Sequence, residues 1–291
     1  MTITLDELKA LIHAVSDRDT SAVPSTWSAD NPLWGHCRVA SCIVQKMFGG
    51  ELLTQDLAGT KYAPVSHYSN CLPDGTQYDL TESQFDADFS LVGIEPKVRP
   101  RAYALDAEKS PKNVARYKLL YWRVMGALNP DNPLFRDEMY RECFFAALDS
   151  DCAKMHFGCV FVHDGKIVHT HANKKIPAIA HRCQPECCRN TITSRPESRI
   201  GACSHAEEGL WAVANMGIKP KEVEMYIAGF QSDMTPWLKT EAEHTCIRCA
   251  TPIHLAGIRA VHIPINDHWE ALDLATMLDT AFSYAVGEKK V

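Results

Sequence analysis

The stretches His205-Ala-Glu-Glu208 and Thr245-Cys-Ile-Arg-Cys249 carry the strongest chemical pattern in this chain of 291 residues. His205, Cys246 and Cys249 offer one imidazole and two thiolates, which together make three protein ligands for zinc. A site with three protein ligands leaves the fourth tetrahedral position open for water, as catalytic rather than structural zinc requires. Glu207 is a carboxylate two residues after the histidine, and it can move the protons of that water. The two stretches therefore predict a catalytic zinc centre.

The spacing of these residues suits ligation at two helix starts. Apolar periodicity predicts helices over residues 205–216 and 246–255, so one ligand opens each helix. Helix N-termini carry partial positive charge, which lowers the pKa of a thiol there. Cys246 and Cys249 are three residues apart and so share one face of a first turn. The alternatives are a structural zinc site with Cys203 as its fourth ligand, or unrelated core cysteines.

The composition, with 46% hydrophobic and 23% charged residues, is typical of a soluble globular protein. The sequence starts without the basic and apolar regions of a signal peptide, and no apolar run reaches membrane-spanning length. We therefore expect a cytoplasmic protein without a membrane partner, whose 12 cysteines are reduced thiols and metal ligands rather than disulfides. A net charge of −6 argues against a nucleic-acid partner and is compatible with a small anionic ligand in a local basic pocket.

The segment Asn129-Pro-Asp-Asn-Pro133 is the strongest break in the chain, because two prolines stand among turn formers. We expect an N-terminal domain over 1–128, a linker over 129–133 and a second domain over 134–291. In the second domain helices and strands alternate, which favours parallel pairing in a layered α/β sheet. Asp164-Gly165 predicts a hairpin turn between its first two strands. The expected helices are 135–148, 205–216, 246–255 and 268–286, and the expected strands are 157–162, 166–170, 223–230 and 260–264.

The N-terminal domain is predicted to be of the α+β class. Its apolar pattern predicts helices over 4–15, 39–48 and 113–128. The segments 66–72 and 76–80, joined by Pro73-Asp-Gly75, predict a β-hairpin.

From about Phe135 onward the chain resembles the cytidine/deoxycytidylate deaminase superfamily. Besides the two metal stretches, Phe157-Gly-Cys-Val-Phe-Val-His-Asp-Gly-Lys-Ile-Val168 is similar to the first hairpin of that family. Ala250 and Gly257-Ile258 are similar to its deoxycytidylate branch. The resemblance implies a three-layer α/β/α fold, contact of Asn173 with the sugar, and a nucleotide, nucleoside or base as substrate. It also suggests a homo-oligomer.

Two features depart from that family. Thr245 stands where the family has proline, which we expect to alter the loop and to cap the following helix. Residues 206–245, between the first and second metal ligands, are more numerous than is usual in the family. The surplus, 231–244, contains Met234, Trp237 and Leu238; it either lines the substrate pocket or forms a surface loop with a packed tryptophan.

A basic stretch precedes the metal histidine, and we assign Arg189 and Arg195 from it as a clamp for a 5′-phosphate. A solvated loop is the alternative. Some deoxycytidylate deaminases carry a second, structural zinc in this region, and four thiols here could form one. Packed free cysteines are the alternative, because adjacent thiols are awkward ligands for one tetrahedral ion. The candidate ligands are His181, Cys183, Cys187, Cys188 and Cys203.

The first 126 residues resemble the YunG-like family, which looks papain- or transglutaminase-like. The matching stretches are Trp27-Ser-Ala-Asp-Asn-Pro32, Gly35-His-Cys37, Gly49-Gly-Glu51, Ser66-His-Tyr-Ser-Asn70, Asp79-Leu-Thr-Glu-Ser-Gln-Phe85 and Arg116-Tyr-Lys-Leu-Leu120.

Cys37 opens a predicted helix, a position that favours the thiolate. His67 starts one hairpin strand and Asp79 ends the next, so the three residues can act as nucleophile, base and orienter. Asn70 is an alternative orienter. The opposing interpretation is a degenerate domain that serves docking or assembly.

We expect a zinc-dependent deaminase of a cytosine nucleotide, most simply dCMP to dUMP and ammonia, with Glu207 as proton shuttle. A first alternative keeps the zinc chemistry and changes the substrate to another aminated base, nucleoside or nucleotide. A second alternative is a thiol amidase, peptidase or acyltransferase in which Cys37 does the main chemistry. A nucleic-acid editor is disfavoured by the acidity and by the lack of an aromatic-basic stripe.

Overall fold

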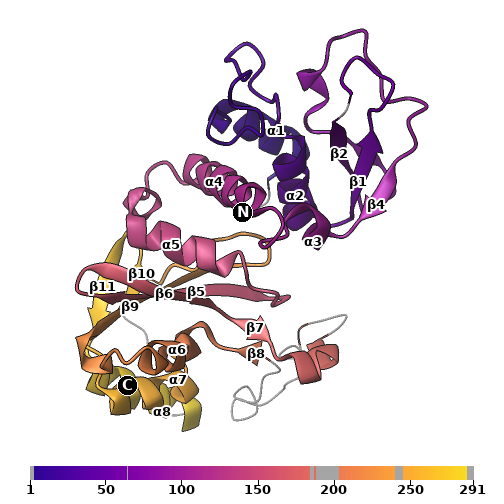
Figure 1. Cartoon of the computed structure of the whole chain (residues 1–291). Coiled ribbons are helices and arrows are strands. Elements are labelled where there is room, and N and C mark those ends of the chain that lie inside the picture. Colours follow the sequence, from indigo (N-terminus) through magenta and orange to yellow (C-terminus); the bar gives the residue numbers. More distant parts are fainter. Residues whose placement is uncertain (1–2, 64, 184–186, 188–202, 240–244, 287–291) are drawn as a thin grey trace. The chain divides into compact units, whose positions relative to one another are not determined.

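The computed structural model describes residues 3–63, 65–183, 187, 203–239 and 245–286. The chain forms two compact units, Met1–Pro130 and Asp131–Val291, and the division falls inside the segment 129–133 (Figure 1). Both units combine helices with a β-sheet, as an α/β protein requires. Within the described ranges, no helix combines the length and the apolar character needed to span a membrane.

The N-terminal unit contains an antiparallel sheet with strand order β3-β2-β1-β4. Helix α2 packs on β2, and α4 packs on both α1 and α2, so the core lies between the sheet and these helices. The helices are α1 (Leu5–Val15), α2 (Cys37–Phe48), α3 (Arg101–Ala104) and α4 (Pro111–Leu128), and the strands are β1 (Glu51–Asp56), β2 (Ser66–Cys71), β3 (Gln77–Tyr78) and β4 (Lys97–Arg99). The three expected helices and the hairpin are confirmed, whereas β1, β4 and α3 were not predicted.

The C-terminal unit contains a five-stranded sheet with order β11-β10-β9-β5-β6. Helix α5 covers one face, and α6, α7 and α8 lie on the other (Figure 1). The apolar core on the second face joins Phe161 of β5 to Leu210, Ile253 and Met277 of the three helices. The strands are β5 (Met155–His163), β6 (Lys166–Ala172), β9 (Val223–Gln231), β10 (Ala260–Ile265) and β11 (His268–Leu272), beside a small pair of β7 (Lys174–Lys175) and β8 (Cys203–Ser204). The helices are α5 (Glu138–Ala147), α6 (Leu210–Asn215), α7 (Ile247–Ala256) and α8 (Leu274–Val286).

The expectation of parallel pairing is wrong for most of this sheet. Only β9 and β10 run parallel, while β5 is antiparallel to β6 and β9, and β10 is antiparallel to β11. Tight turns impose the antiparallel direction of the β5–β6 and β10–β11 pairs. Asp164 and Gly165 both have positive φ (49° and 70°), as a two-residue hairpin turn requires, and Asn266 (φ 50°) begins a similar turn before β11.

Three predicted helices have different bounds in the structure. The helix expected over 268–286 is wrong in its first part, since β11 occupies His268–Leu272. The helix expected over 205–216 starts as a 3-10 turn, Ala206–Gly209, before α6. In the helix expected over 135–148, Asp137 caps α5 by accepting a hydrogen bond of 2.8 Å from the Tyr140 amide, which separates α5 from a preceding 3-10 turn.

Gly158 of β5 is required by the close approach of α5. A Cβ at this position would lie 2.0 Å from the Cys143 carbonyl oxygen and 2.7 Å from the Ala147 amide nitrogen. Because both atoms are backbone, α5 would have to shift, and we expect Gly158→Ala to lower the free energy of unfolding by about 1–3 kcal/mol. Urea denaturation measures this, with Thr170→Ala on the exposed side of β6 as control. Equal losses in the two variants would contradict the packing argument.

Candidate metal centre and thiol site

Three side chains of the C-terminal unit converge in a group that can hold a metal ion. His205 Nδ1 lies 3.2 Å from Cys246 Sγ and 3.3 Å from Cys249 Sγ. All three donor atoms lie within 4.8 Å of one another. Donors on one tetrahedral zinc ion are roughly 3.5–3.8 Å apart, given bond lengths of about 2.0–2.3 Å. The donor set and its spacing therefore fit zinc.

Local structure explains the convergence. His205 precedes the 3-10 turn Ala206–Gly209, and Cys246 is the N-cap of α7, with Cys249 in the first turn of that helix. The turn packs tightly on the sheet, because a Cβ on Gly209 would lie 2.6 Å from the Cβ of His171. This close approach was not predicted, and only a glycine permits it.

The expectation that Thr245 caps the helix is wrong. Helix α7 takes Cys246 as its N-cap residue, and that position has no side-chain capping bond. The hydroxyl of Thr245 instead lies 3.9 Å from the sulfur of Met277 in α8.

The metal-binding group found among the described residues consists of His205, Cys246 and Cys249 alone. Cys203, the fourth ligand of the structural-zinc alternative, is not part of it. Within the described ranges, no fourth histidine, cysteine or carboxylate joins these donors. Among the described residues the group thus supplies three protein ligands, the number that leaves one tetrahedral position for water in catalytic zinc sites.

The two adjacent carboxylates beside the histidine have different partners. Glu208 forms an ion pair with Arg248 of α7. Glu207 forms a hydrogen bond with the Cys249 thiol, and burial raises the pKa of its carboxyl group. Glu207 is therefore the carboxylate that stays beside the three candidate metal ligands. The ion pair with Arg248, which holds Glu208 away, was not predicted.

Of the two ligand cysteines, Cys246 loses its thiol proton more readily than Cys249. A hydrogen bond from the Cys249 thiol, together with the His205 imidazole, lowers the pKa of Cys246 to about 4. The same hydrogen bond and burial raise the pKa of Cys249.

Asn173 follows β6 and is bound to the backbone of β5. Its Oδ1 accepts a hydrogen bond of 2.7 Å from the Phe157 amide, and its Nδ2 donates one of 2.9 Å to the Met155 carbonyl. The side chain is 7% exposed. Contact with a sugar stays a prediction, and it would use the second lone pair of Oδ1.

Two substitutions test the structural role of the hydrogen bonds between Asn173 and β5. Asn173→Asp keeps the acceptor for the Phe157 amide and removes the donor to Met155, so we expect a loss of about 1–3 kcal/mol in unfolding free energy. Asn173→Ala removes both bonds and should cost more. Thermal denaturation of both variants tests the order, and an unchanged stability in Asn173→Ala would contradict the structural role.

The described part of the surplus segment packs against the sheet edge. The Trp237 amide donates to the Gly229 carbonyl at 2.8 Å, and the Trp237 ring meets Phe157 edge-on, with centroids 5.1 Å apart. Met234 is buried, and Leu238 lines an open pocket with Asn266. The tryptophan is thus packed, at the same sheet edge as Asn173.

Both arginines of the proposed phosphate clamp and one candidate ligand of the second metal site fall outside the described residues. Cys188, Arg189 and Arg195 lie outside the described residues. Cys183 and Cys187 are buried, whereas His181 is exposed.

The structure of the N-terminal unit brings the three predicted thiol-site residues together. Cys37 is the first residue of α2, His67 lies in β2, and Asp79 directly follows β3. His67 Nε2 lies 2.7 Å from Asp79 Oδ2, and the Cys37 thiol forms hydrogen bonds with the His67 imidazole and the Tyr68 amide. The alternative orienter, Asn70, instead donates to the Ser41 carbonyl at 3.0 Å.

Both titrating groups of this site are shifted towards their charged forms. Burial alone would raise the pKa of Cys37, but the hydrogen bonds with His67 and Tyr68 outweigh it and lower that pKa. Burial alone would lower the pKa of His67, but Asp79 and Cys37 raise it to about 10. Both shifts favour a thiolate paired with an imidazolium over a neutral thiol beside a neutral imidazole.

One member of the thiol site was not predicted. Gln84 Nε2 lies 3.2 Å from His67 Nδ1 and donates to Thr81 Oγ1 at 3.1 Å. Its position in a short 3-10 turn, Glu82–Gln84, gives no recognisable sequence signal.

A comparison with protein families agrees with the expectation for the N-terminal half. The model described as YunG protein matches residues 4–129. The N-terminal unit is YunG-like. A comparison with curated proteins finds no match to the chain. The resemblance of the other half to deaminases stays a prediction.

Proposed function

We propose that the C-terminal unit is a zinc-dependent hydrolytic deaminase of a cytosine nucleotide, which converts dCMP to dUMP and ammonia. The observation that carries the proposal is the convergence of one imidazole nitrogen and two thiols beside the carboxylate of Glu207. The similarity of both metal stretches and of the β5–β6 hairpin to the deaminase superfamily supports it.

His205, Cys246 and Cys249 would hold the ion by one nitrogen and two sulfurs. When bound, zinc would bring the pKa of a water ligand down to around 7, which supplies hydroxide near neutral pH. Glu207 would take the proton of that water and deliver it to the ring nitrogen of the base. The water oxygen would then bond to the amine-bearing carbon. Glu207 would take the proton that remains on this oxygen and give it to the amine, and the carbon–nitrogen bond would break to release ammonia.

The substrate class rests on weaker support than the reaction. Asn173 and Trp237 lie at the sheet edge where β9 ends, on either side of Phe157. The parallel strands β9 and β10 end here, and ligands often bind beyond the carboxyl ends of parallel strands, which supports contact of these residues with a base or sugar. The specific observation that keeps another aminated base or nucleotide open is the packed Trp237 segment, which departs from the family.

Ammonia release from a panel of substrates tests the proposal. Zinc-loaded protein is given dCMP, CMP, deoxycytidine, cytidine, cytosine and AMP, and ammonia is measured. We expect release with dCMP and weaker or no release without the phosphate. Ammonia release only from another compound of the panel would support deamination and identify a different substrate. No ammonia release from any compound of the panel would overturn the proposal.

A further inference from the structure

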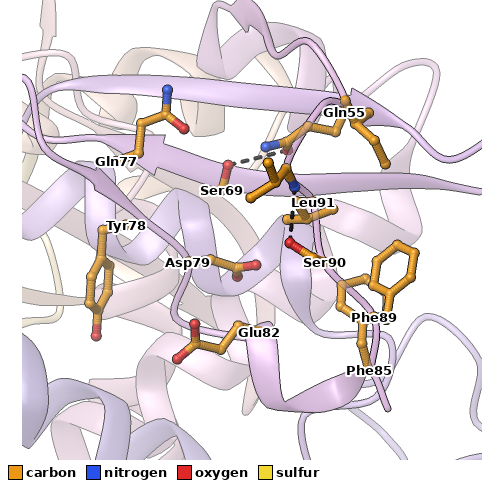
Figure 2. Close-up of a pocket in the computed structure, with 12 residues that line it drawn as sticks. Gln55, Ser69, Gln77, Tyr78, Asp79, Glu82, Phe85, Phe89, Ser90 and Leu91 are labelled. Carbon is orange, nitrogen blue, oxygen red and sulfur yellow. Dashed lines mark hydrogen bonds between the residues drawn. The ribbon is translucent and has the colours of Figure 1, made fainter. Parts of the chain in front are cut away.

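A pocket of about 360 Å³ in the N-terminal unit is lined by Asp79, the carboxylate that contacts His67 (Figure 2). Asp79 stands in its wall between Ser69 and Glu82, and the rings of Phe85 and Phe89 close another side. Phe85 also contacts the His67 imidazole, with ring centroids 4.9 Å apart. Space for a small molecule therefore lies beside Asp79, the carboxylate that contacts the His67 imidazole.

The start of α2 can also stabilise negative charge beside Cys37. The N-cap residue, His36, makes no side-chain capping bond. Its ring nitrogens are engaged elsewhere, with Thr20 Oγ1 at 2.8 Å and the Trp34 carbonyl at 3.1 Å. The first amides of a helix have no intrahelical acceptor, so the amides near the thiol are available to an oxyanion that develops there.

A second cysteine of the same helix, Cys42, lies in a different environment. Cys42 is fully buried one turn further along α2, and burial raises its pKa to about 12. Cys37 is partly exposed and touches the imidazole of His67. The contact with His67 and the exposure distinguish the reactive thiol from the inert one.

We propose that Cys37 is the nucleophile of a thiol site that hydrolyses carboxamides, a second activity beside that of the metal centre. The Cys37 sulfur bonds to the carbonyl carbon, the carbon–nitrogen bond breaks, and the leaving nitrogen takes the proton of the His67 imidazolium. Water then gives one proton to His67, its oxygen bonds to the acyl carbon, and the carbon–sulfur bond breaks to regenerate the thiolate. The sum is carboxamide plus water giving carboxylic acid plus amine.

Cys37 and His67 are the catalytic residues, and Asp79 is a positioning residue. The carboxylate fixes the ring through Nε2 and favours the imidazolium, which a leaving amine needs as its acid. Carboxamides are assigned over activated esters for this reason, since an ester leaving group does not need the proton.

The full-length protein, with a zinc chelator present, tests nucleophilicity with p-nitrophenyl acetate. We expect a burst of one p-nitrophenolate per chain, with the acetyl group mapped to Cys37 by mass spectrometry. Cys37→Ala should abolish the burst, while Cys42→Ala should retain it. A burst that survives in Cys37→Ala, or acetylation at another residue, would overturn the proposal. Because the chelator disables the metal centre, this result is independent of the deaminase assay.

Amide hydrolysis is tested with p-nitroacetanilide under the same conditions. Release of p-nitroaniline that depends on Cys37 is expected, and His67→Ala should lower its rate by about 10²–10⁴-fold. An ester burst without anilide turnover would overturn the carboxamide assignment.

The pH dependence of iodoacetamide alkylation separates activation from folding. Thiolate is lost as the pH falls through the lowered pKa of Cys37, so the alkylation midpoint of Cys37 should lie below that of an unperturbed thiol. Asp79 raises the pKa of His67, so Asp79→Asn should move downward the pH midpoint at which anilide turnover is lost on the basic side. An unchanged midpoint in Asp79→Asn, in protein that remains folded by circular dichroism, would contradict the positioning role. Anilide turnover should fall again as the pH rises through about 10, where the His67 imidazolium is lost.

Discussion

Replacing Glu207 by glutamine is expected to lower ammonia release by about 10²–10⁴-fold while zinc remains bound. Glutamine has the same shape as glutamate but cannot accept the proton of a water molecule. The three ligand side chains are untouched, so the metal content should equal that of the native protein. The loss should therefore appear in kcat and not in zinc stoichiometry.

The neighbouring carboxylate provides a matched control for this experiment. Glu208 is paired with Arg248 of α7. Glu208→Gln removes the same charge one residue away, and the partly exposed ion pair that it breaks contributes about 0–1 kcal/mol. We expect ammonia release within tenfold of native protein. If Glu208→Gln were the inactive variant and Glu207→Gln the active one, the assignment of the proton shuttle would be wrong.

The residues that converge at each site could be named from the sequence because short-range rules fix them. Two cysteines three apart at a helix start must share one face, and Cys246 and Cys249 do. The hairpin turn at Asp74-Gly75 sets β2 against β3, which brings His67 and Asp79 within 2.7 Å. Local signals were sufficient for these two pairs, whereas the approach of His205 to Cys246 and of Cys37 to His67 was inferred from the chemical pattern and the family resemblances.

The partners of those residues depend on contacts between distant segments, which the sequence does not show. Arg248 reaches Glu208 from another helix, and Gln84 reaches His67 from a turn 17 residues away. The prediction of parallel strands was wrong for a related reason. Alternating helices and strands favour parallel pairing only where a helix joins the strands, and β11 follows β10 through the turn at Asn266 instead.

Cys249→Ser is expected to weaken zinc binding by at least about 100-fold, since even changes beyond the ligand shell cost about 10–100-fold. A serine hydroxyl is far less acidic than a thiol and is a poor ligand for zinc at neutral pH. Cys249 is 2% exposed and is held in the first turn of α7, so its sulfur has a fixed position beside the other two donors. Titration of the metal-free protein with zinc measures the affinity directly.

Stability provides a second readout of the same change. A ligand at 100 times its dissociation constant stabilises the folded state by about 2.7 kcal/mol, so zinc should raise the unfolding temperature of native protein. The rise should be lost in Cys249→Ser at the same zinc concentration.

Cys203→Ser decides between the two kinds of site. A three-ligand catalytic centre keeps its zinc affinity and ammonia release without Cys203, because that thiol is not part of the ligand group. If Cys203→Ser lost both as fully as Cys249→Ser, four protein ligands would surround the ion, no position would remain for water, and hydrolysis at this centre would be excluded.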